Sequence, residues 1–371
     1  MKAVGIILAG GGNERLAALT VNRTTSAIPI GSCYRAIDFP LSSMTNSGVR
    51  KVAIITQHNS RSLHDHLSSP KWWDLGSKQG GMFILSPYMT SDNRGWFKDT
   101  ADAIFQNLTF LKRSKEPYVV ISSGDCVYKM DFNDMIAYHE RKNADITIAY
   151  RRVSDGEDIR NYGVLELDEH ERLLDLEEKP LEPQSDLASM GVYVISRTLL
   201  IELLETIAAE GRHNLVRDII VRYRKQKRIF GFRFDGYWRN LSSVQAYFDC
   251  NMDFLKRDIR ALLTIEQPYI STKPKDEPPA KFNSQAVVTN CLVGSGAILD
   301  GNAYRSVIFR RVYTGVHSQV NNSIVMEGTK IGEGAVIEHA IIDKEVIINP
   351  GMQVVGTPEF PVIISKGSVV R

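Results

Sequence analysis

The sequence LAGGG at residues 8–12 is the first stretch whose residue types could bind an anion. Glycines that follow a strand let backbone N–H groups approach phosphate oxygens, and Arg15 supplies a cation a few residues later. A tight strand-to-helix turn explains the same glycines without any ligand. We therefore predict phosphate binding at Gly10, Gly11 and Arg15, with the plain turn as the alternative.

Two charged residues further along the chain could complete such a site. Asp125 comes directly after the apolar run YVVIS and Ser-Gly, where a carboxylate can hold Mg²⁺ against phosphates. Its alternative role is to cap the helix or turn that follows. Lys179, in the sequence LEEKP, could hold a sugar phosphate as a compact charge, and Ser189 offers a hydroxyl. The alternative for Lys179 is an ordinary surface loop.

The elements that must position these residues alternate between buried strands and helices. Continuous apolar runs rich in β-branched residues are typical of parallel strands that helices cover on both faces. Such runs predict strands at 4–8, 51–56, 118–122 and 146–150, with helices at 42–48, 102–113, 132–142 and 242–263. The pattern indicates an α/β domain with an open, doubly wound, mostly parallel sheet. Ligands of such sheets lie beyond the carboxyl ends of the strands, where LAGGG and Asp125 are placed.

The composition changes twice in the last third of the chain. Residues 264–282 are rich in proline and lack apolar periodicity, which predicts an extended linker. At 283–371, glycine and β-branched residues recur with a six-residue apolar period, as at Val325 and Ile331. This period is typical of a stacked parallel β-helix, whose flat flank and open end suit oligomerisation. We therefore predict an α/β domain at 1–263, a linker and a β-helix domain.

Composition narrows the function classes. The chain of 371 residues is 43% hydrophobic, and its 45 basic and 43 acidic residues leave a net charge of +2. This balance gives no basis for binding nucleic acid or a membrane, and we interpret the basic run at 222–228 as a solvated helix end. No apolar run approaches the roughly 18 residues of a membrane span.

The cysteines and histidines do not form a metal-binding pattern. Four cysteines lie far apart, which predicts reduced thiols in a cytoplasmic protein. His64 and His66 look like a metal pair, but neighbours at i and i+2 do not share a helix face. We therefore predict that this pair lies on the surface.

Six motifs, in this order, resemble the bacterial glucose-1-phosphate adenylyltransferase (ADP-glucose pyrophosphorylase) family: LAGGGNERL, YRAIDFPLSSMTNSG, WFKDTADAIFQN, SGDCVYKMD, LEEKP with SMGVYV, and GYWRN. The resemblance covers nearly the whole chain. It implies an α/β domain like that of nucleotide-diphospho-sugar transferases, a left-handed β-helix and a tetramer. The family joins ATP and glucose 1-phosphate into ADP-glucose and pyrophosphate, which feeds glycogen synthesis.

The resemblance also implies roles for individual residues. It assigns the nucleotide to Leu8, Ala9, Gly10, Gly11, Arg15 and Gly124. It assigns the sugar phosphate to Gly163, Glu178, Lys179 and Ser189, with Lys179 on the phosphate. Mg²⁺ is the one implied cofactor, with Asp125 as its ligand.

Five positions depart from the family pattern. Asn13 stands in place of a loop glycine, and Asp99 replaces the glycine of Gly-Thr-Ala-Asp-Ala, where it adds negative charge near an anionic substrate. Thr25 replaces the lysine that faces the triphosphate. Asn240 replaces the second metal carboxylate, and Asn214 replaces an aspartate that usually follows a histidine.

These changes remove a cation and a metal carboxylate from a site that works by stabilising negative charge. No catalytic set is intact: the vestigial residues are Arg15 and Asp125, and the degenerate ones are Asn13, Thr25 and Asn240. We therefore predict a regulatory subunit with little activity alone, which binds the catalytic subunit in a mixed tetramer. Because Asp125 and Lys179 are kept, ATP or a sugar phosphate is a candidate effector of the same site.

Two alternatives remain open. An active enzyme with a rearranged site could use Arg23 or Lys129 as the missing cation. An acyltransferase built on the β-helix would need His317 or His339 in a cleft between coils.

Overall fold

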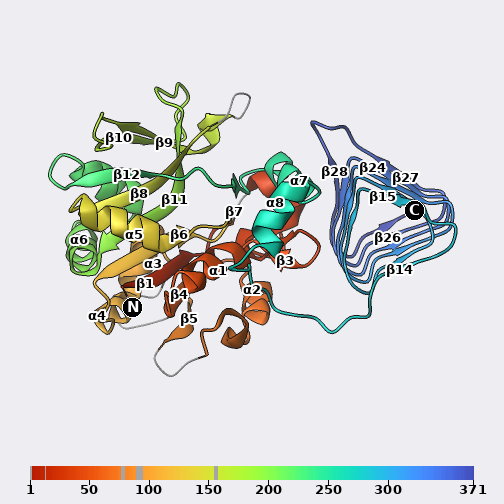
Figure 1. The fold of residues 1–371 in the computed structure, drawn as a ribbon, viewed down its shortest axis with the longest axis horizontal. Coiled ribbons are helices and arrows are strands. Elements are labelled where there is room, and N and C mark those ends of the chain that lie inside the picture. Colours follow the sequence, from red (N-terminus) through yellow and green to blue (C-terminus); the bar gives the residue numbers. More distant parts are fainter. Residues whose placement is uncertain (1, 13, 77–79, 89–94, 154–157) are drawn as a thin grey trace.

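The computed structural model describes residues 2–371 except for 13, 77–79, 89–94 and 154–157. Figure 1 shows an α/β part that contains the N-terminus and a triangular β-helix that contains the C-terminus. A segment without helix or strand, residues 266–280, crosses from one to the other.

The centre of the α/β part is a nine-stranded mixed sheet in the order β10-β9-β11-β6-β1-β4-β5, with β8 and β12 continuing from β11. Its strands are β1 (Ala3–Leu8), β4 (Lys51–Ile55), β5 (Gly81–Leu85), β6 (Tyr118–Ser123), β8 (Ile146–Arg152), β9 (Gly163–Leu167), β10 (Leu173–Glu178), β11 (Leu187–Ser196) and β12 (Ile229–Arg233). β1 pairs in parallel with β4 and β6, and β11 runs antiparallel to β6, β8 and β9. Two short antiparallel pairs lie beside it: β2 (Pro29–Ile30) with β3 (Tyr34–Arg35), and β7 (Cys126–Tyr128) with β13 (Trp238–Asn240). The predicted α/β sheet is confirmed, and it is a mixed sheet, because β11 pairs antiparallel with three strands and β10 pairs antiparallel with β9.

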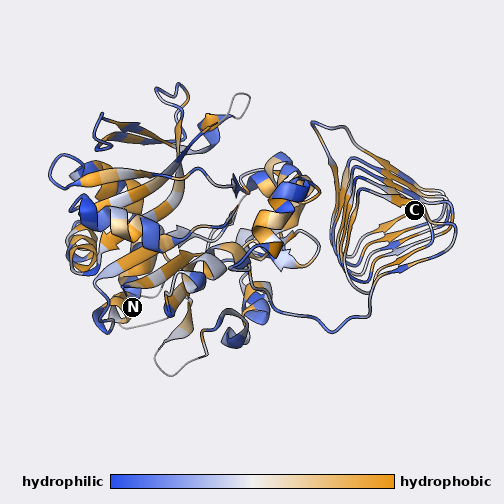
Figure 2. Cartoon of the chain, in the orientation of Figure 1, coloured by the Kyte–Doolittle hydropathy of each residue, from blue (hydrophilic) through white to orange (hydrophobic). Residues whose placement is uncertain are grey.

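Helices cover both faces of this sheet because strand residues alternate between two apolar clusters. Ile7 and Ile54 share one cluster with α1 (Asp38–Asn46), α2 (Arg61–His66) and α5 (Phe132–Arg141). Ile6 and Ile121 share the other with α3 (Thr100–Gln106), α4 (Leu108–Lys112) and α6 (Arg197–Ala209). Figure 2 shows the resulting hydrophobic strands in the centre and hydrophilic outer helix faces. No helix in the described ranges is long and apolar enough to cross a membrane.

The remaining helical segments are short. They are η1 (Glu14–Thr20), η2 (Thr25–Ala27), η3 (Pro70–Trp73), η4 (Ile159–Asn161), η5 (Val216–Val221), α7 (Val244–Asp253), α8 (Arg257–Arg260) and η6 (Ala261–Ile265). The helix predicted at 242–263 is therefore broken into α7, α8 and η6. The helix predicted at 102–113 is also interrupted, because Asn107 leaves the helical conformation between α3 and α4. The helix expected after LAGGG is the 3-10 helix η1.

The C-terminal part is the predicted left-handed parallel β-helix, built from three sheets. The first sheet contains β14 (Lys281–Phe282), β17 (Ile298–Leu299), β20 (Tyr313–Thr314), β23 (Lys330–Ile331), β26 (Ile347–Ile348) and β29 (Val369–Val370). The second contains β15 (Val288–Thr289), β18 (Asn302–Tyr304), β21 (Gln319–Asn321), β24 (Val336–Glu338) and β27 (Gln353–Val355). The third contains β16 (Leu292–Val293), β19 (Val307–Ile308), β22 (Ile324–Val325), β25 (Ala340–Ile342) and β28 (Val362–Ile364). Buried residues of successive coils, such as Leu299 and Ile331, stack into its own core.

The third sheet of the β-helix packs against the α/β part. Leu16 and Leu19 of η1 share an apolar cluster with Val307, Ile324 and Met326, and all five are fully buried. In Figure 1 this face lies toward α7 and α8. The segment that follows the glycine loop is therefore held by the β-helix.

Candidate functional site

A cleft of about 650 Å³ opens at the carboxyl ends of β1 and β6. Most residues that the sequence indicated line it: Leu8, Gly10, Gly11, Arg15, Thr25, Asp125, Gly163, Glu178, Lys179, Ser189 and Asn240. Segments that are far apart in the sequence therefore meet around one space. Asn13 lies outside the described residues.

The glycine loop after β1 leaves open space on its cleft side. A side-chain carbon added at Gly11 or Gly12 would meet no atom within 4 Å, whereas one at Gly10 would lie 3.2 Å from the backbone nitrogen of Gln57. Arg15 donates from Nη1 to Oδ1 of Asn161 at 3.0 Å, which joins the loop side of the cleft to η4. The loop and its cation are thus arranged as expected, and Asn161 is a lining residue that no sequence motif indicated.

Two residues assigned to the nucleotide lie behind the cleft wall. Ala9 is 1% exposed, and its carbonyl accepts a hydrogen bond from the Thr24 hydroxyl at 2.9 Å. The Gly124 N–H donates to the Leu8 carbonyl at 2.9 Å, and a side chain at Gly124 would collide with Oγ of Ser26 at 2.6 Å. Their polar groups are used within the protein, so Ala9 and Gly124 support the wall but do not line the cleft.

The other end of the cleft gathers the residues assigned to the sugar phosphate. Glu178 pairs with Gly163 between β10 and β9, and a side-chain carbon at Gly163 would lie 3.1 Å from Oε2 of Glu178 and 3.5 Å from Ser189. Desolvation in the cleft raises the pKa of Glu178, and the Lys179 charge opposes this rise. Lys179 has a left-handed backbone with φ of 51°, and its N–H donates to the Tyr162 carbonyl at 3.0 Å. The four predicted residues therefore form one compact group.

The predicted metal site contains one carboxylate. Asn240 pairs with Cys126 between β13 and β7, and the Leu241 N–H donates to the Asp125 carbonyl at 3.0 Å, which places Asn240 beside Asp125. The Asp125 carboxylate accepts a hydrogen bond from the Ser123 hydroxyl. Across the described ranges, no three His, Cys, Asp or Glu side chains gather as they would around a metal. One carboxylate and a neutral amide do not fit a Mg²⁺ site held by the protein alone.

The two parts of the chain match different protein-family models. The model of the nucleotidyl transferase family matches residues 4–257, and the model of the GlmU-like C-terminal hexapeptide family matches residues 278–359. The glucose-1-phosphate adenylyltransferases of Bacillus thuringiensis (strain Al Hakam), Bacillus anthracis and Bacillus mycoides (strain KBAB4) are each 37% identical to this chain over 353 residues. The match covers 94% of this chain and 94% of each relative. The chain belongs to the glucose-1-phosphate adenylyltransferase family.

The family resemblance expects a lysine at position 25, and the two cations considered as its replacement are both engaged elsewhere. Arg23 bonds with Nη2 to both carboxylate oxygens of Asp343 in the β-helix, one of them at 2.6 Å. Lys129 donates from Nζ to the carbonyls of Leu262 and Glu266 at 2.9 and 2.7 Å, at the end of η6. Neither side chain lines the cleft. Arg23 and Lys129, the two alternatives for the missing cation, therefore both lie away from the cleft in this structure.

A cation that no sequence argument had singled out, Lys98, lines the cleft. Lys98 is exposed there, and its backbone N–H donates to Oδ2 of Asp102 at 2.7 Å. The preceding Phe97 donates its N–H to Oε1 of Gln57 at 2.7 Å, and its carbonyl accepts from Nε2 of Gln57 at 3.3 Å. Gln57 also borders Gly10. Lys98 thus extends from a fixed backbone close to the glycine loop. Its position within the motif WFKDTADA was the only sequence feature that could have indicated a place in the site.

Asp99 also lines the cleft, but both of its carboxylate oxygens are engaged. Oδ1 accepts from the Thr100 N–H at 2.6 Å and caps α3, and Oδ2 accepts from Nδ2 of Asn214 at 2.9 Å. Asp99 therefore adds a negative charge to the cleft wall, as the sequence indicated, and its two carboxylate oxygens are oriented by the Thr100 N–H and the Asn214 amide. Two departures from the adenylyltransferase pattern that look independent in the sequence form one contact.

The His64 and His66 side chains are used within the protein. His66 is 6% exposed and its Nε2 lies 2.7 Å from Oδ1 of Asp38. His64 Nε2 lies 3.0 Å from the Thr56 hydroxyl. The predicted surface position is therefore wrong for His66, because Asp38 offers it a buried charged partner. The four cysteines are free thiols, in accordance with the prediction of reduced cysteines.

Proposed function

We propose that the chain is a regulatory subunit of glucose-1-phosphate adenylyltransferase whose own cleft is degenerate. The observation that carries this proposal is the loss of two charges where the phosphates of ATP would bind. Thr25 stands where the family resemblance expects a lysine, Asn240 stands beside Asp125 in place of a carboxylate, and Arg23 points into the β-helix interface.

The physical reason lies in the charge that nucleotidyl transfer must stabilise. Such reactions depend on positioning and on fixed charges around the phosphates. Removing one preorganised donor of this kind typically lowers the rate by about 10² to 10³. The loss of a cation and a carboxylate together predicts a chain with little activity of its own.

The retained part of the cleft supports a second element of the proposal. Gly163, Glu178, Lys179 and Ser189 still form a compact group, and the glycine loop still leaves open space. We therefore propose that glucose 1-phosphate or ATP binds as an effector. Titration calorimetry with each ligand tests this element, and absence of heat with both would overturn it.

The proposed partner is the catalytic adenylyltransferase subunit, in a mixed tetramer in the cytoplasm that supplies ADP-glucose for glycogen synthesis. The test is pyrophosphate release from ATP and glucose 1-phosphate with Mg²⁺, by the chain alone and mixed with the catalytic paralogue. The proposal expects no activity alone and altered kinetics in the mixture. Full activity of the chain alone, or an unaltered partner, would contradict it.

One observation favours an alternative function, an active adenylyltransferase with a rearranged site. Lys98 places a cation on the cleft wall near the glycine loop, as described above. If Lys98 replaces the missing lysine, the chain alone releases pyrophosphate and Lys98→Ala abolishes that activity. The same assay therefore separates the two functions.

A further inference from the structure

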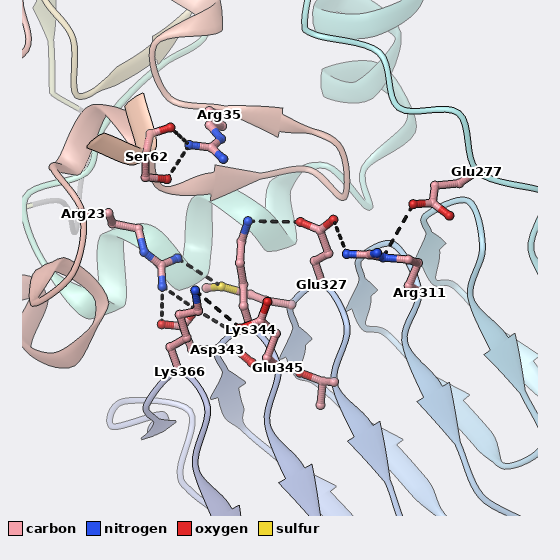
Figure 3. A network of polar contacts seen from close by, with 12 residues as sticks. Arg23, Arg35, Ser62, Glu277, Arg311, Glu327, Asp343, Lys344, Glu345 and Lys366 are labelled. Carbon is pink, nitrogen blue, oxygen red and sulfur yellow. Dashed lines mark hydrogen bonds and ion pairs between the residues drawn. The ribbon is translucent and has the colours of Figure 1, made fainter. Parts of the chain in front are cut away.

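A buried ion pair joins the cleft wall to the β-helix. Arg23 is 5% exposed and Asp343 is fully buried, and Nη2 of Arg23 bonds to both carboxylate oxygens. Nη1 of Arg23 lies 3.8 Å from Sδ of Met326, on the preceding coil. Figure 3 shows the guanidinium directed away from the α/β part and into the rim of the β-helix. Both carboxylate oxygens accept from the one nitrogen Nη2, and these charge-assisted hydrogen bonds hold that end of the guanidinium at Asp343.

The ion pair continues into a chain of charges along the β-helix rim. The backbone N–H of Lys344 donates to Oδ1 of Asp343 at 2.7 Å, and its Nζ lies 3.1 Å from Oε2 of Glu327. Glu327 in turn pairs with Arg311 at 3.1 Å, and Arg311 reaches Glu277 of the connecting segment (Figure 3). Asp343 is therefore held in place by its own domain and presents a fixed anchor to Arg23.

The residue that follows Arg23 bonds directly to the glycine loop. The Thr24 hydroxyl oxygen lies 2.9 Å from the Ala9 carbonyl oxygen and 3.2 Å from that of Gly11, so its one hydrogen is shared between two loop carbonyls. The Thr24 N–H donates to the Asn59 carbonyl at 3.3 Å. Thr24 is 1% exposed, so water offers these groups no alternative partner. The position of residue 24 therefore determines the position of the loop carbonyls.

The other flank of the loop is held by the same domain. Leu16 and Leu19 of η1 are fully buried against Val307, Ile324 and Met326. The β-helix thus anchors the chain both directly after the glycine loop and at Arg23. None of the described β-helix residues lines the cleft itself, so any influence on ligands must act through these anchors.

We propose that Arg23 and Asp343 form a positioning pair, through which the β-helix holds residues 24–26 against the glycine loop and sets the affinity of the cleft for a nucleotide's phosphates. The affinity part rests on the proposed ligand binding, whereas the positional part does not. In this proposal Arg23 positions the loop, whereas the sequence had offered it as an alternative catalytic cation.

The test compares Asp343→Asn, which keeps the shape and removes the charge, with Glu345→Gln on the same coil. Glu345 also forms an ion pair, 3.5 Å from Lys366, but its side chain is 64% exposed and this partner belongs to the β-helix (Figure 3). The first measurement is amide hydrogen exchange without ligand. The reporters are the Thr24, Ala27 and Ile28 amides, which are all hydrogen-bonded.

We expect Asp343→Asn to raise the exchange of these amides at least tenfold while β4 and β6 keep their protection, and Glu345→Gln to change neither. Arg23→Lys, which keeps the charge, should restore part of the protection that Arg23→Gln loses. Equal exchange in Asp343→Asn and Glu345→Gln, or a uniform rise over the whole α/β part, would overturn the positional part.

The second measurement is calorimetric binding of ATP and of glucose 1-phosphate to the same variants. We expect Asp343→Asn to weaken ATP binding about tenfold and glucose 1-phosphate binding less than twofold, because the Lys179 end of the cleft does not depend on Thr24. Equal weakening of both ligands, or of neither, would overturn the affinity part. If the unchanged protein binds neither ligand, the effector proposal and the affinity part fall together, and hydrogen exchange alone decides the positional part.

Discussion

Asn214 donates its side-chain amide to the carboxylate of Asp99 at 2.9 Å and so joins the loop before η5 to the first turn of α3. A second hydrogen bond beside it, from the Leu215 N–H to the Thr100 hydroxyl at 3.0 Å, reinforces this contact. The family resemblance expects an aspartate at position 214 and a glycine at position 99. Relative to that pattern, the negative charge of this contact lies on Asp99, which lines the cleft, and not on residue 214, which does not.

This exchange predicts that the two positions are energetically coupled. Asn214→Asp alone would place two carboxylates in hydrogen-bonding contact, and we expect it to lower the free energy of unfolding by about 1–2 kcal/mol at pH 7. The double change Asp99→Gly with Asn214→Asp removes the repulsion and should recover most of this loss. Thermal unfolding of the four proteins of the cycle measures the coupling.

Low pH provides the control for this cycle. Protonation of one of the two carboxylates supplies an O–H donor. The difference in free energy of unfolding between Asn214→Asp and the unchanged protein should therefore shrink from pH 7 to pH 4. A double variant that is as unstable as Asn214→Asp would contradict the coupling.

The second prediction concerns the lost charges of the cleft. Thr25→Lys with Asn240→Asp restores the cation and the carboxylate that the family pattern expects, in side chains that already line the cleft. We expect the double change to raise pyrophosphate release by at least ~10²-fold over the unchanged chain, since each such group typically contributes that much. Steady-state assays of both single variants show whether the groups act as a unit. A gain below twofold would favour the rearranged site.

Lys98 is the subject of the third prediction. If its ammonium faces the phosphates, Lys98→Ala should weaken ATP binding about tenfold, which corresponds to about 1.4 kcal/mol, and leave glucose 1-phosphate binding unchanged. Lys115→Ala is the matched control, because Lys115 is exposed and does not line the cleft. Equal effects of the two substitutions in titration calorimetry would remove Lys98 from the site.

The fourth prediction concerns stability in acid. His139 is 2% exposed, its Nδ1 lies 2.8 Å from the Thr147 hydroxyl, and burial lowers its pKa from 6.5 to about 4. In the unfolded chain this imidazole binds a proton below pH 6.5, whereas in the folded chain it stays neutral down to about pH 4. The free energy of unfolding therefore decreases as the pH falls through this window. In the unchanged protein this effect lowers the free energy of unfolding by on the order of 2 kcal/mol between pH 6.5 and 4.5, and His139→Gln should abolish it.

Chemical denaturation at several pH values checks this prediction. His170→Gln is the control, because the His170 side chain is 79% exposed and its substitution should leave the slope unchanged. A pH profile that is the same for His139→Gln and the unchanged protein would contradict the assignment.

Many strands and both domains were predictable because the local pattern of apolar residues depends on which faces of a strand are buried. Continuous β-branched runs predicted the parallel strands β1, β4 and β6, and the six-residue period predicted the β-helix. Motifs at strand ends predicted cleft residues such as Asp125 and Lys179, because parallel strands bring their carboxyl ends to one edge of a sheet. Helix ends were less predictable, since the break at Asn107 depends on the contacts that the chain makes after it folds.

The directions of long side chains were decided by tertiary structure alone. From the sequence, Arg23 is a cation two residues from a phosphate site, but in the fold it turns to Asp343, which lies 320 positions later. Lys129 turns in the same way to carbonyl groups at the end of η6. A buried charge must find a partner or lose its hydration without compensation, so the side chain turns toward whichever partner the folded chain brings near. That partner is a property of the packing between the α/β part and the β-helix, which no local stretch of sequence contains.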